Sequence, residues 1–194
     1  MMTVQQIEER LSNKCVGIAG VGGLGSRCAE ALVRVGVGKM ILVDFDVVNE
    51  SNLNRQFFFT DQIGMKKVDA LYDNLIRIRP YLALAIHHQR VTPQNVRLLF
   101  ADCDVVVEAM DEAKEKEWFI REISLQYPNT PLVAASGISG WGNLGALKVV
   151  RHTNLIVCGD GSGEASDETP PIAARVGIVA CMQADVVIEL LLSK

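Results

Sequence analysis

A glycine-rich turn between two apolar stretches is the part of the sequence best suited to chemistry. It runs from Gly20 to Ser26 as Gly-Val-Gly-Gly-Leu-Gly-Ser, after the apolar run Cys15–Ala19 and before about a dozen helix-compatible residues. Gly20 permits a tight turn, Gly22 leaves room for a phosphate, and Gly25 lets the helix pack closely on the sheet. The N-terminus of a helix offers free N–H groups and a positive dipole end to an anion. The turn therefore predicts a nucleotide-binding βαβ unit.

A second apolar run ends in a carboxylate that suits a nucleotide. This run, Met40–Asp44, follows the turn at the distance of about twenty residues at which a carboxylate accepts the hydroxyl groups of a ribose. We therefore expect Asp44 to hold the ribose. The nucleotide itself stays open on these grounds, because dinucleotide and ATP sites both use such a turn.

The polar segment after Asp44 carries side chains suited to phosphate oxygens. Arg55 offers a planar fork of five donors, Lys67 a compact mobile charge and Asn52 an amide. Each residue alone could belong to a solvated turn with a helix cap at Ser51. As a set beside the glycine turn, they predict a triphosphate cradle, which a dehydrogenase does not need. We expect Lys67 to face a solvent-filled cleft and to make little packing contact.

Hydrophobic periodicity predicts the elements that position these groups. We expect helices at Thr3–Leu11, from the glycine turn to about Val35, and at Lys66–Arg79, 92–100, Glu112–Gln126 and Ile172–Leu192. We expect strands at Cys15–Ala19, Met40–Asp44, Leu82–His88, Asp104–Ala109 and Leu132–Ala135, then one ending at His152 and one at Asn154–Val157. This alternation predicts an α/β, Rossmann-like three-layer fold whose mainly parallel sheet is continued by antiparallel strands.

Polar residues also stand at the ends of two later strands. Asp111 comes just beyond an apolar strand, where open parallel sheets place functional groups, and it could also cap the next helix. His87 and His88 end another strand. A metal site there would need further ligands at a workable spacing, so we interpret the two histidines as the surface end of the strand.

Composition limits the class of protein. The chain has 194 residues, 49% hydrophobic and 22% charged, as in a soluble globular domain of ordinary size. Its formal net charge is -4, and no run of Lys or Arg forms a basic stripe. We therefore expect a protein or small-molecule partner and no nucleic acid.

Cysteines and apolar runs indicate a cytoplasmic protein. The five cysteines are odd in number, scattered and mostly set in apolar runs, which suits a reducing compartment. Residues 1–14 lack the apolar segment of a signal peptide. The apolar run Ile172–Leu192 is long enough to span a bilayer, but charged and amide side chains interrupt it throughout. We expect a buried helix and no membrane partner. The interrupting residues are Arg175, Gln183, Asp185 and Glu189.

Four motifs together resemble the ThiF/MoeB/HesA family, the bacterial relatives of ubiquitin-activating enzymes. They are the turn 20–26, Asp44-Phe45-Asp46, Ser51-Asn52-Leu53-Asn54-Arg55-Gln56, and Gly64-x-x-Lys67. The run 174–184 is also similar to the final helix of that family. The resemblance implies one adenylation domain over residues 1–194. It implies ATP- and magnesium-dependent adenylation of the C-terminal glycine carboxylate of a ubiquitin-like sulfur carrier, by a homodimer.

The resemblance also implies roles for single residues. Asp111 takes the place of the aspartate that binds magnesium in the family, and Arg55, Lys67 and Asp111 are the expected catalytic residues. The nucleotide-binding residues expected in all are Gly20, Gly22, Gly23, Gly25, Asp44, Asp46, Asn52, Arg55, Gln56 and Lys67.

Two departures from the family pattern refine this picture. Many members carry two Cys-x-x-Cys pairs that hold zinc, and this chain has none, so we expect no zinc. The N-terminal motif that lends an arginine across the dimer is also missing, and Arg10 is the only arginine before the first strand. The chain is most similar to the short, zinc-free ThiF branch linked to thiamine biosynthesis, which implies the carrier ThiS.

Two glycine-rich segments have open roles. Relatives have a crossover loop where this chain has the segment from Cys158 to Thr169, and a cysteine of that region transfers sulfur in some of them. No basic neighbour is evident that would lower the pKa of Cys158. The turn 136–142 fits a simple hairpin, and the resemblance suggests that a diglycine tail passes near it.

Other functions also remain open. The activated carboxylate could belong to a molybdopterin carrier, a peptide or a tRNA. The chain could be an NAD-dependent oxidoreductase, against which the phosphate cradle argues, or a non-catalytic nucleotide-binding partner. The missing arginine keeps the last alternative open.

Overall fold

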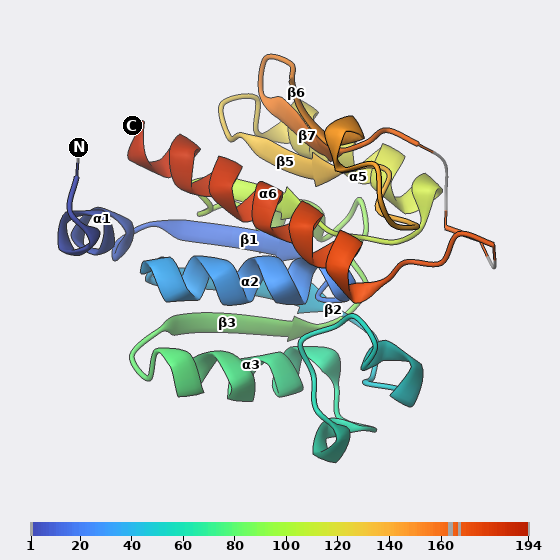
Figure 1. Cartoon of the computed structure of the whole chain (residues 1–194). Helices are drawn as coiled ribbons and strands as arrows, with labels where there is room; N and C mark the ends of the chain where they lie inside the picture. Colours follow the sequence, from blue (N-terminus) through green and yellow to red (C-terminus); the bar gives the residue numbers. More distant parts are fainter. Residues whose placement is uncertain (1, 163–164, 167, 194) are drawn as a thin grey trace.

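The centre of the computed structural model is a seven-stranded sheet of order β3-β2-β1-β4-β5-β7-β6 (Figure 1). The structure describes residues 2–162, 165–166 and 168–193. All neighbouring strands are parallel except β6, which is antiparallel to β7. The expected fold, a mainly parallel Rossmann-like sheet with an antiparallel continuation, is confirmed. The strands are β1 Cys15–Ala19, β2 Lys39–Asp44, β3 Ala83–His88, β4 Val105–Glu108, β5 Leu132–Ala135, β6 Lys148–Arg151 and β7 Leu155–Gly159.

Helices cover both faces of this sheet and complete the three layers (Figure 1). Helices α2, α3 and α6 pack on one face, and α4 and α5 lie on the other. The helix α1 precedes β1, so it lies at the amino ends of the strands. The helices are α1 Val4–Leu11, α2 Gly23–Val35, α3 Lys67–Ile78, α4 Val96–Leu99, α5 Ala113–Gln126 and α6 Ala173–Leu192. Short 3-10 turns occupy Glu50–Asn52, Thr60–Gln62 and Leu144–Ala146.

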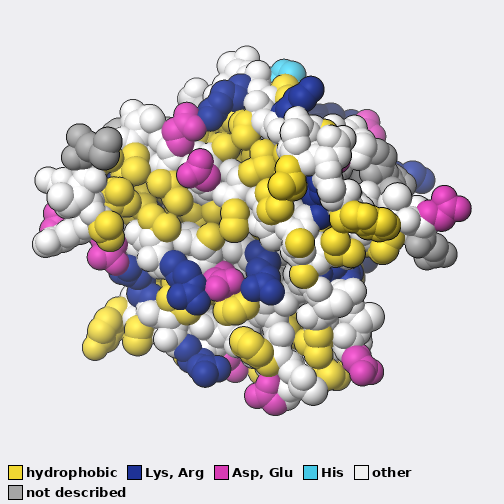
Figure 2. All heavy atoms as spheres, in the orientation of Figure 1, with side chains coloured by type: hydrophobic (Ala, Val, Ile, Leu, Met, Phe, Trp, Pro, Cys, Tyr) yellow, Lys and Arg dark blue, Asp and Glu magenta, His cyan; other side chains and the backbone are white. Residues whose placement is uncertain are grey.

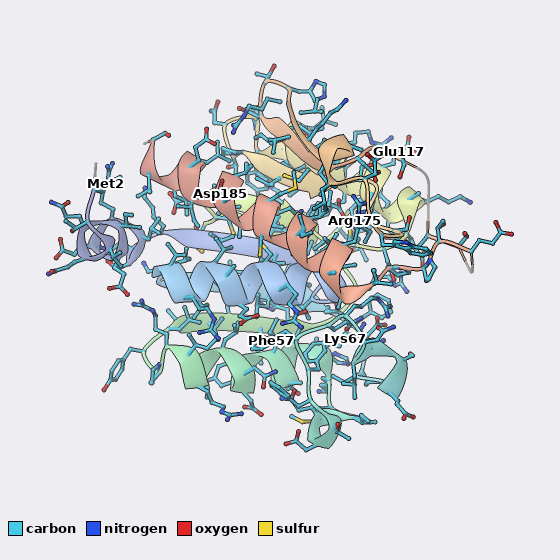
Figure 3. The ribbon with its side chains drawn as sticks, in the orientation of Figure 1. Met2, Phe57, Lys67, Glu117, Arg175 and Asp185 are labelled. Atoms are coloured by element: carbon cyan, nitrogen blue, oxygen red, sulfur yellow. The ribbon has the colours of Figure 1, made fainter. Side chains whose placement is uncertain are left out.

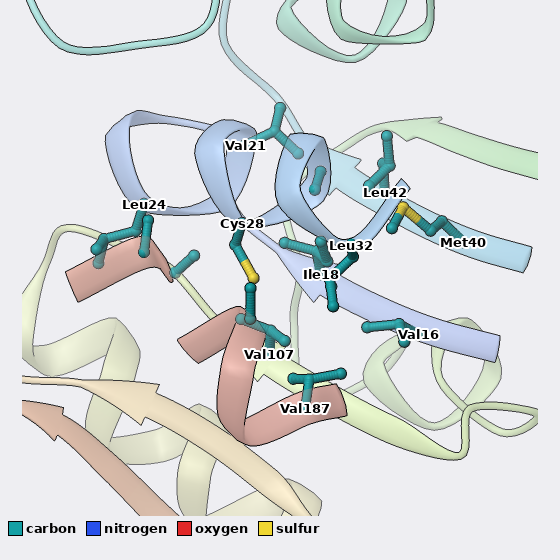
Figure 4. Close-up of a cluster of buried hydrophobic side chains, with 14 of the residues drawn as sticks. Val16, Ile18, Val21, Leu24, Cys28, Leu32, Met40, Leu42, Val107 and Val187 are labelled. Atoms are coloured by element: carbon teal, nitrogen blue, oxygen red, sulfur yellow. The ribbon is translucent and has the colours of Figure 1, made fainter. Parts of the chain in front are cut away.

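The larger core lies under α2, α3 and α6. Leu24, Cys28 and Leu32 recur at the spacing that puts residues on one face of a helix, and all three are buried. Figure 4 shows them in one cluster with Val107 of β4 and Val187 of α6. A second core fills the opposite face, beneath α4 and α5. Burial on both faces explains why the central strands read as unbroken apolar runs.

The outer surface of α2 is charged. Glu30 pairs with Arg27 and with Arg34 at helical spacing, and Figure 2 shows basic and acidic side chains side by side over this helix. Hydrophobic side chains gather above them, over α6. Within the described residues, no helix is long and apolar enough to cross a membrane.

Two expected elements differ from the structure. The helix expected over 92–100 is only Val96–Leu99. The side chains of Thr92 and Asn95 each accept the backbone N–H of the other residue, which holds the chain before Val96 in a turn. Cys158 lies inside β7 and is buried, so its placement in a glycine-rich loop was wrong.

Candidate functional site

A cavity of about 650 Å³ opens at the carboxyl ends of the parallel strands. It lies where the strand order reverses, between β1 and β4, because the chain leaves these neighbouring strands toward opposite faces. Its walls come from the glycine turn, the segments after β2, β3, β4 and β5, and the start of α6. Figure 3 shows Lys67 and Arg175 toward this end of the sheet. The topology therefore gathers residues that are distant in sequence around one crevice.

Close backbone contacts fix the shape of the glycine turn. Gly20 has φ +88°, and a Cβ there would come within 2.6 Å of the Ala109 carbonyl oxygen. A Cβ on Gly25 would lie 1.9 Å from the Gly20 carbonyl oxygen. Gly22 is different, since a Cβ would meet only the side chain of Gln56, at 3.6 Å. The protein therefore needs glycine at positions 20 and 25 for its own packing, whereas Gly22 leaves space open toward the cavity.

The N-terminus of α2 is available to a ligand. Gly22 is its cap residue, and no side chain caps it in the part of the chain that is described. The first N–H groups of a helix have no partner within the helix. Ser26 braces this end, because its hydroxyl donates to the Gly22 carbonyl at 2.6 Å and accepts from the Phe57 N–H at 3.0 Å. The helix thus presents free donors and a positive dipole end to the cavity.

Asp44 ties the glycine turn to the end of β2. One carboxylate oxygen accepts the N–H of Val21 and the other that of Asp46, both at 2.8 Å. The side chain lines the cavity. Since each carboxylate oxygen has a second lone pair, ribose hydroxyls can still be accepted there.

Lys67 differs from the sequence expectation of a solvent-facing side chain. It lines the cavity but is only 6% exposed, and its Nζ lies 2.7 Å from Oδ2 of Asp46. The backbone N–H of Lys67 also donates to the Asp46 carbonyl at 2.9 Å. The ammonium group is therefore held in place at the cavity wall.

The residues of the run 51–56 contribute unequally to the cavity. Arg55 lies beside Gly23, and its Nη1 donates to the Ser51 carbonyl and to Asn54. Gln56 lines the cavity, and its Oε1 is buried without a hydrogen-bond partner among the described residues. Asn52 is absent from the cavity wall, because its Oδ1 accepts the N–H of Asn49 and so closes a 3-10 turn.

Asp111 offers an exposed carboxylate at the cavity wall, next to the exposed Glu112. Among the residues that the structure describes, no three His, Cys, Asp or Glu side chains gather as a metal site. A magnesium ion in a nucleotide site needs only one or two carboxylates, because phosphate oxygens and water supply its other ligands. The position and chemistry of Asp111 fit such an ion.

A buried ion pair between Glu108 and Lys116 was not predicted from the sequence. Glu108 is fully buried at the end of β4, and both its carboxylate oxygens lie 2.9 Å from Nζ of Lys116, which lines the cavity. Burial raises the pKa of Glu108, against the opposing effects of Lys116 and of the Met110 N–H. An acidic residue in an otherwise apolar strand was the signal that could have revealed the pair.

Phe45 and Arg90 form a second feature that the sequence did not reveal. Both line the cavity beyond Asp44, and the Arg90 guanidinium lies 3.9 Å from the centre of the Phe45 ring. Glu115 approaches Arg90 at 3.7 Å. The three side chains form the wall at one end of the cavity.

Two other candidates lie away from this arrangement. Arg10 belongs to α1 at the amino ends of the strands, where its Nη1 contacts the Met2 sulfur at 3.6 Å, so it does not reach the cavity of its own chain. Cys158 is buried, and burial raises its pKa to about 11. A reactive thiolate at that position is disfavoured.

The comparisons with known proteins agree with this architecture. A model of the ThiF family matches residues 3–194. The chain belongs to the ThiF family. The ubiquitin-like modifier-activating enzyme 5 of Caenorhabditis elegans is 44% identical over 87 residues, which are 45% of this chain and 21% of that protein. The Drosophila grimshawi enzyme is 43% identical over 91 residues, 47% of this chain and 23% of that protein. The match thus spans less than a quarter of each curated relative.

Solved structures share the ThiF-family fold. The E. coli tRNA N6-threonylcarbamoyladenosine dehydratase TcdA, solved in complex with ATP, is 19% identical, has a TM-score of 0.88, and aligns over 97% of this chain and 90% of that one. E. coli MccB, solved with ATP, is also 19% identical, with a TM-score of 0.73 over 95% of this chain and 58% of that one. At such identities the likeness shows the fold alone.

In this ThiF-family chain, the cavity brings together most of the residues expected from the sequence. Gly25 and Asn52 lie outside the cavity wall and support the segments that form it. The expected residues that line it are Gly20, Gly22, Gly23, Asp44, Asp46, Arg55, Gln56, Lys67 and Asp111.

Proposed function

We propose that this chain is an ATP-dependent adenylyltransferase. The observation that carries the proposal is the meeting of an uncapped helix N-terminus, an open Gly22 and three charged side chains around one cavity. Arg55, Lys67 and Asp111 supply charges that suit a triphosphate with magnesium and that a nicotinamide dinucleotide does not require. Membership of the ThiF family supports the same reaction.

Each part of the cavity has a role in this proposal. The triphosphate lies over Gly22 and the N-terminus of α2, with Arg55 and Lys67 on its oxygens. Asp44 accepts the ribose hydroxyls, and the base lies beyond it, against the wall of Phe45 and Arg90. TcdA, which shares this fold at 19% sequence identity, was solved in complex with ATP and with AMP, and this supports a nucleotide site in the fold.

The proposed reaction joins two anions. A carboxylate oxygen of the acceptor bonds to the α-phosphorus, the bond from that phosphorus to the oxygen bridging toward the β-phosphate breaks, and pyrophosphate leaves. No protein nucleophile is needed. The protein's task is to position the reactants and to neutralise charge, for which the Lys67 ammonium, fixed by Asp46, is suited. Asp111 would hold magnesium, which neutralises phosphate charge when bound.

For the acceptor, we propose the C-terminal glycine carboxylate of a ubiquitin-like sulfur carrier of the ThiS type, in thiamine biosynthesis. The curated relatives are named as activating enzymes of ubiquitin-like modifiers, which supports a carrier of this class. The far end of the cavity, around Ser136, Gly137 and Ile138, is where such a tail could approach the α-phosphate. A molybdopterin carrier, a peptide or a tRNA-linked carboxylate is the alternative acceptor, as the fold shared with MccB and TcdA illustrates.

The setting of the reaction is also part of the proposal. We propose that residues 1–194 act as one adenylation domain in the cytoplasm and that the active form is a homodimer. Light scattering tests the last point: a strict monomer that is nevertheless active would overturn it.

Carrier-dependent exchange of labelled pyrophosphate into ATP tests the function. The purified chain is incubated with magnesium, ATP and either ThiS or the molybdopterin carrier, with a carrier that lacks its C-terminal glycine as the control. Exchange with ThiS alone supports the full proposal. Exchange with another acceptor supports adenylation and rejects the ThiS assignment, and ATP binding without any exchange indicates a non-catalytic partner.

A further inference from the structure

Two cysteines lie together at the amino ends of the central strands β1 and β4, at the opposite end of the sheet from the nucleotide cavity. Cys15 begins β1, and Cys103 comes just before β4, the strand next to β1. The backbones are joined there, because Asp104 accepts the Cys15 N–H on its carboxylate at 2.9 Å and donates its own N–H to the Cys15 carbonyl at 2.8 Å. These bonds fix Asp104 beside Cys15 and so keep the adjacent residue Cys103 close to Cys15.

The two side chains point to the same face of the sheet. A Cβ on Gly17 would lie 2.7 Å from the Cys103 sulfur, so this face of β1 looks directly onto Cys103. Cys15 is two residues from Gly17 in an extended strand, and its side chain therefore points to the same side. Both cysteines pack in the core cluster beneath α4 and α5.

Solvent reaches one member of the pair. Cys15 is half-buried and lines a hollow of about 580 Å³ together with Lys39, Asp102 and Asp104. Cys103 is buried behind it, 7% exposed. A small molecule that enters the hollow meets Cys15 first.

The pKa values of the two thiols also favour reaction at Cys15 before Cys103. The neighbouring Cys103 thiol lowers the pKa of Cys15, with Lys39 helping, while burial and the carboxylates of Asp104 and Asp102 oppose the shift. The same contact and burial raise the pKa of Cys103. An accessible thiol of lowered pKa beside a second thiol is the arrangement found in redox-sensing proteins.

We propose that Cys15 and Cys103 form a peroxide-sensitive pair that closes to a disulfide. The Cys15 thiolate attacks a peroxide oxygen, the O–O bond breaks, and the departing oxygen takes a proton and leaves as water or an alcohol. Cys103 then attacks the Cys15 sulfenic acid, an S–S bond replaces the S–O bond, and the Cys103 proton leaves with the hydroxide as water. The thiols lose two electrons, which reduce the peroxide, and a dithiol reductant reverses the change.

The other three cysteines differ from this pair in their burial or exposure. Cys28 and Cys158 are fully buried, and burial raises the pKa of both. Cys181 is exposed on α6. Replacing it by serine removes the exposed thiol that most readily joins two chains, and four cysteines then remain.

The experiment uses the full chain carrying Cys181→Ser. It is treated with hydrogen peroxide, alkylated, and digested without reductant for mass spectrometry. We expect loss of two of the four free thiols, a peptide pair cross-linked between Cys15 and Cys103, and recovery of both thiols with dithiothreitol. A cross-link between other cysteines, or oxidation of Cys15 to sulfinic acid without a cross-link, overturns the proposal.

A second variant tests the order of the steps. With Cys103→Ala added, Cys15 should stop at the sulfenic acid and be trapped by dimedone, whereas Cys15→Ser should leave Cys103 unmodified. Circular dichroism checks that both variants fold. Dimedone labelling of Cys103 in preference to Cys15 contradicts the proposed order, and the cross-link in the chain with both cysteines remains decisive if either variant fails to fold.

Discussion

The ammonium group of Lys67 lies 2.7 Å from Oδ2 of Asp46, which ties the first residue of α3 to the segment after β2. Lys67 is almost fully buried, while the Asp46 side chain is 43% exposed. One side of this ion pair faces the cavity, and the other side packs against the rest of the protein. A side chain held in this way can neutralise phosphate charge without first being ordered, and it also contributes to folding.

Lys67→Ala should therefore affect both catalysis and stability. We expect the adenylation rate to fall by about 10² to 10³, the scale for losing one preorganised electrostatic contact. We expect the free energy of unfolding to fall by about 1 kcal/mol, because the pair is only partly shielded from solvent. Pyrophosphate exchange and denaturant unfolding measure the two effects.

Lys66→Ala is the matched control for this prediction. Lys66 is exposed, and its side chain makes no capping hydrogen bond at the start of α3, so its loss should leave both rate and stability nearly unchanged. Equal losses of rate from the two substitutions would mean that Lys67 does not contact phosphate.

Two glycine substitutions should separate folding from ligand binding. Gly22→Ala should fold normally and weaken ATP binding at least tenfold, by roughly 1.4 kcal/mol, because the new methyl group meets little protein and occupies the phosphate space. Gly25→Ala should destabilise the fold by about 3 kcal/mol, because its Cβ collides with the Gly20 carbonyl. Thermal unfolding and calorimetric titration give the two quantities.

Gly177→Ala is the control for the glycine series. A Cβ at this position in α6 meets no atom within 4 Å, so the change should stabilise the helix by about 0.5 kcal/mol and leave ATP binding unaltered. If Gly22→Ala bound ATP as well as Gly177→Ala does, the phosphates would not lie over the turn.

Lys116→Met should expose the dependence of stability on the buried Glu108 carboxylate. Removing the cation leaves that carboxylate uncompensated, and we expect a loss of about 3 kcal/mol near pH 8. Adding Glu108→Gln to Lys116→Met should recover most of the loss. Urea unfolding of the single and double variants checks this, and no recovery in the double variant would show that packing rather than charge is lost.

The pH profile of this pair has a definite sign. The pKa of Glu108 is raised in the folded chain, so between the ordinary glutamate pKa and that raised value the folded state binds more protons than the unfolded state. The contribution of Glu108 to stability is therefore full below this window and is lost as the pH rises through it. Lys116 opposes the raised pKa, so Lys116→Met should extend the loss to higher pH, and Glu108→Gln should abolish it.

Arg90→Ala tests the position of the base. If the adenine lies against Arg90 and Phe45, ATP affinity should fall about tenfold, the scale of one base-stacking contact, while tripolyphosphate should bind unchanged. Arg97→Ala is the control, because Arg97 is exposed and lies outside the cavity wall. Equal weakening of ATP and tripolyphosphate would place Arg90 near the phosphates instead.

The sequence predicted those features that depend on local pattern. The strand ends that carry Asp44 and Asp111, and the turn at Gly20, were placed correctly because apolar runs and glycine spacing are read directly from neighbouring residues. Contacts between distant residues were not predicted. The partners Glu108 and Lys116 lie eight residues apart across a strand, a turn and a helix, and the wall of Phe45 and Arg90 joins the ends of β2 and β3. Asn52 and Cys158 were misjudged for the same reason, since only the fold shows that one closes a turn and the other is buried.

Calorimetric titration of the purified chain with ATP and with NAD, each with and without magnesium, tests the central claim most directly. The phosphate cradle around Gly22, Arg55 and Lys67 and the carboxylate of Asp111 predict ATP binding that strengthens with magnesium, and Asp111→Asn should remove most of that strengthening. Binding of NAD should be weak under both conditions. Tight NAD binding without magnesium-dependent binding of ATP would contradict the account.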